Sequence, residues 1–274
     1  MLQPLLMRRE HGVFDGSAQG LFLFGNRRCR KLPVSPTLSR CRISKASGNC
    51  AAITASPGYW LRAWKNLPPA GGAFTTVTAV DPSEHMIALG RSLPGGNALN
   101  IRWVESFAED FPTSGESFDL TVAAASIHWM DHGRLFPHLL ANATAGHVMA
   151  VISGDDPFEP PWQSDWHSFL RKWVPEVTGQ PFDHDKRSEG MRSYQSYLNL
   201  CGSEQFVSER PFEQSVADFI SCQHSRDTFA PSKLGDQIAS FDAELSELLR
   251  SYSTDDRLSF IVRTGIVWGE IKPI

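Results

Sequence analysis

The chain has 274 residues, of which 41% are hydrophobic and 20% charged, and its formal net charge at pH 7 is −4. This length is enough for one large α/β core, and the composition is typical of a soluble globular protein. The acidic balance argues against a nucleic-acid partner, and no apolar run approaches the length of a membrane-spanning helix, so no membrane partner is expected.

The first 65 residues are strongly basic, because they contain eleven Lys or Arg and only two acids. An Arg-rich and Ser-rich start is typical of a mitochondrial transit peptide, but Pro33 and Pro36 interrupt any long amphipathic helix. We therefore favour a basic extension over residues 1–50, poorly ordered or diverged. None of the five cysteines forms a Cys-x-x-Cys pair, which favours reduced thiols in a cytoplasmic protein.

From about Ala51 onward, strand and helix signals alternate, which predicts one domain over residues 51–274 with a mainly parallel sheet. Ser83 offers an N-cap oxygen to a helix that runs to about Leu93, and a further helix is expected over Gly133–Ala141. The strands expected in this part are short and apolar, as buried strands are: Val77–Val80, Ile101–Glu105, Phe118–Ser126 and His147–Ser153.

Residues 155–250 interrupt this alternation with helices. Two helices with an apolar face are expected there. The face of the first is a stripe of mainly aromatic residues, and the second helix spans about Asp236–Tyr252. An aromatic stripe usually fills a core, which we favour, although a Trp-rich insertion is also where a lid over a pocket would lie. A half-buried closing strand is then expected over Arg257–Trp268. The aromatic stripe consists of Trp162, Trp166, Phe169, Leu170 and Trp173.

Asp81 is the strongest functional candidate. It lies at the carboxyl end of an expected central strand, where open α/β sheets bind ligands. Its carboxylate can accept hydrogen bonds from both ribose hydroxyls of a nucleoside, and an ionised acceptor strengthens such bonds. The alternative is that Asp81 only caps the helix that begins at Ser83. We favour the nucleoside role.

His128 and Trp129 follow the strand that begins at Phe118. His128 can orient a carboxylate or remove a proton. The alternatives are a structural histidine and a tryptophan that fills the core. His128 and His132 are four residues apart, a spacing that binds metal on a helix, but no third ligand is evident and we expect no metal site.

Three segments together resemble the class I S-adenosylmethionine-dependent methyltransferases, in particular the small-molecule branch with the trans-aconitate methyltransferase-like enzymes. The resemblance spans Val77–Ile274 and is specific over residues 77–131. It implies a Rossmann-like seven-stranded sheet with helices on both faces, with its sixth strand over Phe206–Phe212, and a helical cover inserted at 155–250. It also implies methyl transfer from S-adenosylmethionine to a small molecule, with a carboxylate as a candidate acceptor. The segments are Val77–Ser83 with Met86, Ala108–Pro112 and Phe118–Trp129.

The resemblance also assigns roles to single residues. The cofactor would be bound by Asp81 and Ser83 at the strand end, Met86 against the adenine ring, Ala108 and Glu109 at the adenine amino group and ring nitrogens, and Ser126 beneath the sulfonium. The acceptor would meet His128, Trp129, Trp162 and Arg226. The guanidinium of Arg226 can bind a carboxylate through two parallel N–H bonds; its alternative is a surface pair with Asp227.

The Gly-x-Gly-x-Gly loop that this family places after its first strand is degraded here. The best candidate keeps only Gly58, and Pro57 removes an N–H donor. A non-catalytic binding protein that retains the fold is therefore the main alternative. An NAD-dependent oxidoreductase is less favoured, because it needs a Gly-x-Gly-x-x-Gly that the sequence lacks. A further hypothesis is that residues 19–57 are diverged or read out of frame. The oligomeric state is left open.

Overall fold

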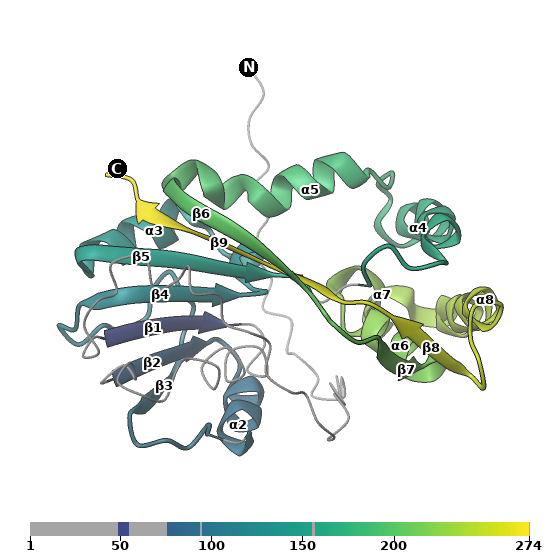
Figure 1. The fold of residues 1–274 in the computed structure, drawn as a ribbon, viewed down its shortest axis with the longest axis horizontal. Helices are drawn as coiled ribbons and strands as arrows, with labels where there is room; N and C mark the ends of the chain where they lie inside the picture. Colours follow the sequence, from purple (N-terminus) through teal and green to yellow (C-terminus); the bar gives the residue numbers. More distant parts are fainter. Residues whose placement is uncertain (1–48, 55–75, 94, 155–156, 274) are drawn as a thin grey trace. The chain divides into compact units, whose positions relative to one another are not determined.

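The computed structural model describes residues 49–54, 76–93, 95–154 and 157–273 (Figure 1). The predictions for residues 1–48 and for Gly58 and its loop lie outside the described residues. The described residues form two compact units. The sheet unit contains the described part of 49–160, Asp183–Phe212 and 260–273, and the helical unit contains Pro161–Phe182 and Glu213–Ser259.

The sheet unit is built on a seven-stranded sheet with the order β3-β2-β1-β4-β5-β9-β6. The first five strands in the chain pair in parallel, and β9 is antiparallel to both of its neighbours, β5 and β6. The predicted α/β class with a mixed sheet is therefore confirmed. The strands are β1 (Asn49–Thr54), β2 (Thr76–Asp81), β3 (Ile101–Glu105), β4 (Phe118–Ala124), β5 (Ala143–Ser153), β6 (Leu198–Val207) and β9 (Arg263–Ile271).

The strand order reverses beside β1. From β1 the chain builds outward through β2 and β3, and it then returns to place β4 on the other side of β1. Ligands of open α/β sheets bind outside the carboxyl ends of the strands at such a switch point. The fold therefore directs attention to the segments that follow β2, β3 and β4.

Helix starts in this unit follow the local capping rules. Helix α2 (Glu84–Ser92) begins after Ser83, whose Oγ accepts the Met86 N–H at 3.3 Å, which confirms the predicted N-cap. Helix α3 (His132–Ala141) begins after Asp131, whose Oδ1 accepts the N–H groups of Gly133 and Arg134. The 3-10 helix η1 (Ile127–Trp129), helix α5 (His184–Arg192) and the 3-10 helix η2 (Ser193–Tyr197) complete the unit.

Two apolar clusters lie on opposite faces of the sheet. Met149 and Val151 belong to one cluster, and Val148 and Ala150 belong to the other. Successive residues of a strand point to opposite faces, so both faces of β5 are covered. The α3 helix contributes Leu135, Phe136 and Leu139 to the first cluster.

The helical unit has an aromatic core. The ring of Phe241 lies at centroid distances of 5.1, 5.2 and 4.8 Å from the rings of Phe169, Trp173 and Phe229. Trp162 is 1% exposed. The aromatic stripe thus packs as core, as we favoured. The elements are α4 (Gln163–Thr178), β7 (Phe212–Ser215), α6 (Val216–His224), η3 (Asp227–Phe229), α7 (Pro231–Leu234), η4 (Gly235–Gln237), α8 (Ile238–Arg250) and β8 (Arg257–Phe260).

Several strand predictions were wrong in their limits. The strand expected from His147 begins four residues earlier, at Ala143. The strand expected over Phe206–Phe212 is split between β6 and β7, because Ser208 leaves the ladder and exchanges hydrogen bonds with Val262. The single closing strand is likewise two strands, β8 and β9. The strand that starts at Phe118 ends at Ala124, two residues early, because Ala125 turns to a φ of 53°.

Candidate functional site

The carboxyl ends of β2, β1 and β4 lie side by side. Asp81, the last residue of β2, is paired with Glu105 at the end of β3. Thr54, at the end of β1, is paired with Ala124 at the end of β4. The residues predicted to bind the cofactor after β2 and β4 therefore emerge along one edge of the sheet.

Asp81 combines burial with an unused acceptor. The residue is 2% exposed, and its Oδ1 accepts the Ser83 N–H at 2.9 Å. Its Oδ2 is buried and finds no hydrogen-bond partner among the described residues. Burial raises the pKa of this carboxyl to about 6, partly offset by the Ser83 N–H bond. The helix-cap alternative accounts for one oxygen only, and the other fits a hydroxyl donor, since a buried unpaired acceptor is costly.

Ser83 and Met86 are arranged by the start of α2. The Ser83 hydroxyl oxygen accepts the Met86 N–H, so it is already engaged at the helix cap. Met86 is half-buried, one residue before the buried Ile87. The cap therefore fixes both residues next to Asp81, and their predicted contacts with a cofactor stay predictions.

The Ala-Glu-Asp segment after β3 is anchored to the start of α3. Glu109 Oε1 accepts the Asp131 N–H at 2.7 Å, and Asp110 Oδ1 pairs with Arg134 Nη2 at 2.5 Å. Ala108 is buried. One carboxylate oxygen of Glu109 thus accepts the backbone N–H at the start of α3, and an adenine contact would have to use the other carboxylate oxygen. Sequence reasoning missed this anchor. A capping box would place an acid three residues after the N-cap Asp131, but Arg134 stands there, and this absence was the signal that the acceptor comes from elsewhere.

After β4 the chain enters a tight turn. Ser126 is 1% exposed, and η1 follows it directly. His128 is half-buried and its ring lies 4.9 Å from the ring of Trp129, which is 54% exposed. The alternative in which Trp129 fills the core is therefore wrong. His128 lies in η1, beyond the end of β4.

The two remaining acceptor candidates belong to the helical unit. Trp162 lies between Phe219 and Tyr252, with ring centroids at 6.1 and 6.2 Å, inside the core of its unit. Arg226 is half-buried and precedes η3, and its N–H donates to the Gln223 carbonyl. Their predicted contacts with an acceptor stay predictions.

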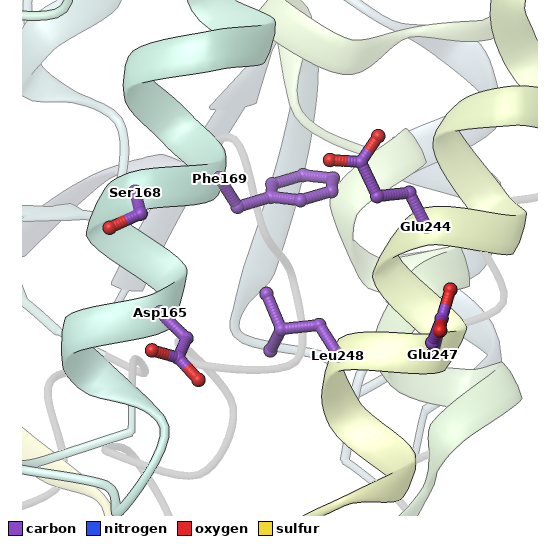
Figure 2. A pocket seen from close by; sticks show the side chains of 6 residues that line it. All are labelled: Asp165, Ser168, Phe169, Glu244, Glu247 and Leu248. Atoms are coloured by element: carbon purple, nitrogen blue, oxygen red, sulfur yellow. The ribbon is translucent and has the colours of Figure 1, made fainter.

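The helical unit also carries an open groove of about 390 Å³ between α4 and α8 (Figure 2). Its carboxylates are partly engaged, because Asp165 accepts the Tyr252 hydroxyl at 2.7 Å and Glu244 pairs with Lys172 at 2.5 Å. None of the predicted site residues lines it. The lining residues are Asp165, Ser168, Phe169, Glu244, Glu247 and Leu248.

Within the part of the chain that the structure describes, no cluster of three or more His, Cys, Asp or Glu could hold a metal ion. His132 instead lies within 2.9 Å of the Ile127 carbonyl oxygen through its Nε2. In the same described ranges, no helix combines the length and apolarity needed to cross a bilayer.

Comparisons with known proteins agree with this geometry. Residues 53–146 match a family described as "Methyltransferase domain". Trans-aconitate 2-methyltransferase of Escherichia coli is 29% identical over 156 residues, which cover 53% of this chain and 56% of that enzyme, and the Shigella dysenteriae enzyme matches equally. The chain thus spans about half the length of the curated relatives it matches.

Solved structures share the fold at low identity. A proposed type II methyltransferase from Anaeromyxobacter dehalogenans has a TM-score of 0.59 at 18% identity, with 89% of this chain and 100% of that chain covered. A proposed methyltransferase from Bacillus halodurans has a TM-score of 0.50 at 14% identity, with 87% and 98% covered. At these identities the likeness shows the fold alone.

Proposed function

We propose, from the premise that this chain contains a class I S-adenosylmethionine-dependent methyltransferase domain, that it transfers a methyl group from this cofactor to a small-molecule acceptor. One observation carries the proposal. The Oδ2 of Asp81, at the carboxyl end of β2, is buried and has no hydrogen-bond partner among the described residues. A ribose hydroxyl is a donor that would satisfy it.

The described residues fit such a cofactor. Asp81 would accept the ribose hydroxyls, and Met86 and Ala108 would offer apolar surface to a flat base. Ser126 would lie under the reacting end. S-adenosylmethionine, when bound, supplies a methyl group that its positively charged sulfur has already activated. The chain therefore has to align donor and acceptor and to exclude competing water, which is mainly a matter of positioning.

The acceptor decides whether a base is needed. A carboxylate acceptor is ionised at neutral pH and needs none, whereas a hydroxyl has to lose its proton. Among the described residues that follow β4, His128 is our candidate for that base. The name of the E. coli relative motivates trans-aconitate as the first carboxylate to try.

Calorimetry tests the proposal. The full chain should bind S-adenosylhomocysteine and not NAD. The Asp81→Ala variant should bind it more weakly by about 1.5–3 kcal/mol, the range for hydrogen bonds to a charged group. Asp119→Asn is the matched control, because it removes one negative charge at the start of β4, where Asp119 accepts the Thr144 hydroxyl. Binding of NAD in preference, or equal affinity in wild type and Asp81→Ala, would remove the proposed site.

A further inference from the structure

His132, the first residue of α3, connects two segments that are distant in sequence. Its Nε2 lies 2.9 Å from the Ile127 carbonyl oxygen in η1. Its Nδ1 lies 3.4 Å from the Ser193 hydroxyl, and the same hydroxyl is 2.8 Å from the Gly190 carbonyl oxygen at the end of α5. One imidazole thus lies between the turn that follows β4 and the end of α5.

The chemistry of the partners sets the orientation of the ring. A carbonyl oxygen can only accept, so Nε2 of His132 carries a proton and donates to Ile127. The ring is also held from its sides, because it packs edge-on against Phe136 and Tyr197 at 5.9 and 6.0 Å. Those two rings are stacked on each other at 4.7 Å with an interplanar angle of 5°. The imidazole is therefore fixed by hydrogen bonds and by packing together.

The turn that receives this hydrogen bond is short. Its backbone bonds run from Trp129 N–H to the Ser126 carbonyl and from Met130 N–H to the Ile127 carbonyl, at 2.9 and 3.2 Å. A single 3-10 turn has poor hydrogen-bond geometry of its own. The Ile127 carbonyl also accepts from His132, and this second bond stabilises the turn that presents His128 and Trp129.

We propose that His132 is a positioning residue, which fixes the η1 turn carrying His128 and Trp129 and places it beside the end of α5, where the Ser193 hydroxyl can donate its one proton either to Nδ1 of His132 or to the Gly190 carbonyl. Helix α5 lies against η1 within the sheet unit. The hydrogen bonds place Gly190 and Ser193 beside His132, and we assign these two residues to the acceptor side of the site. That assignment rests on the proposed function, whereas the positioning of the turn is independent of it.

Fluorine NMR of the full chain labelled with 5-fluorotryptophan tests the proposal. The chain has eight tryptophans, and Trp129→Phe assigns the resonance of Trp129. The His132→Leu variant should shift or broaden this resonance, and His132→Gln, which keeps an amide N–H donor, should restore it. His138→Leu is the matched control, because it makes the same substitution on the same helix and has no bond to η1 among the described contacts.

The outcomes separate the two proposals. In any methyl-transfer assay that the wild type supports, His132→Leu should lower kcat by about 10–100-fold, as misplaced groups do, while the Kd for S-adenosylhomocysteine is unchanged. A Trp129 resonance that is unaffected by His132→Leu, or is affected equally by His138→Leu, overturns the positioning role. Failure of the wild type to bind S-adenosylhomocysteine overturns the proposed function and leaves the Trp129 result to be judged by itself.

Discussion

The carboxylate of Glu109 accepts the backbone N–H of Asp131 at 2.7 Å, across 22 positions of sequence. In a capping box the acid that binds the N-cap N–H stands three residues into the same helix. In α3 that position is Arg134, and the acid comes from the segment after β3 instead. The Ala-Glu-Asp segment, which family resemblance connects with adenine, therefore also completes a helix start.

Removal of this bond should destabilise the sheet unit. We expect Glu109→Ala to lower the free energy of unfolding by about 1 kcal/mol, because the Asp131 N–H loses its acceptor at an exposed site. Urea denaturation measures the change, and amide hydrogen exchange at Asp131 should accelerate. The control is Asp110→Asn, which breaks an exposed ion pair with Arg134 and should cost less. A larger loss in the control would contradict the assignment.

Asp81 should make stability depend on pH in the cofactor-free chain. Its pKa in the folded chain, about 6, lies above the ordinary value of 3.8 because the carboxyl is buried. The folded state therefore binds the proton more tightly, and its contribution to stability is lost as the pH rises from about 4 to 6. We expect Asp81→Asn to be more stable than wild type by about 1–3 kcal/mol at pH 8 and equal to it at pH 4, measured by urea denaturation.

His147 should act in the opposite direction. Burial lowers the pKa of this histidine to about 4, below the ordinary 6.5, and its Nε2 lies 2.9 Å from the Thr121 hydroxyl. Its contribution is present above pH 6.5 and is lost as the pH falls toward 4, by about 2–3 kcal/mol. The double variant His147→Leu with Thr121→Val removes both polar partners, and its free energy of unfolding should fall less steeply over this range. An equal slope would contradict the prediction.

The two groups therefore oppose each other between pH 4 and 6. The free energy of unfolding of the wild type should therefore change less with pH in this range than either group alone would make it change. Asp81 stabilises the folded chain more at lower pH, and His147 stabilises it more at higher pH. The separate variants, compared at the same pH values, are needed to see each contribution.

Gly90 should not tolerate a methyl group, although it lies in a helix. Helix propensity favours Ala over Gly by about 1 kcal/mol. However, a Cβ at position 90 would lie 2.3 Å from Cη2 of Trp103, so we expect Gly90→Ala to destabilise by about 1–3 kcal/mol. Gly190→Ala in α5, where nothing lies within 4 Å of the new Cβ, should be neutral or stabilising. Calorimetric melting temperatures distinguish the two signs.

Local patterns in the sequence predicted the parts of this structure that depend on nearby residues. The strand Ile101–Glu105 was predicted with its observed limits, and Ser83 was predicted as the cap of α2. Asp81 was placed at a strand end, where the structure has it. In each case a short apolar run or a cap residue is enough to predict where the strand or helix begins or ends.

The parts that were missed depend on residues far away in sequence. No local signal shows that Glu109 binds at Asp131, or that Ser208 leaves the strand to bond with Val262. The end of β4 was misplaced because small residues continue through Ala125, whose positive φ is imposed by the turn that follows. The roles of Trp162 and Arg226 were taken from resemblance, and they remain predictions.

The position of β9 between β5 and β6 has a consequence for how the chain is made. Both neighbours precede β9 in sequence, so a nascent chain that has emerged through β6 holds two strand edges that still lack their common partner. Unpaired edges of this kind are templates for pairing with other chains. Synthesis of the sheet unit therefore passes through a stage exposed to aggregation, and that stage ends only when Arg263–Ile271 pairs between its two neighbours.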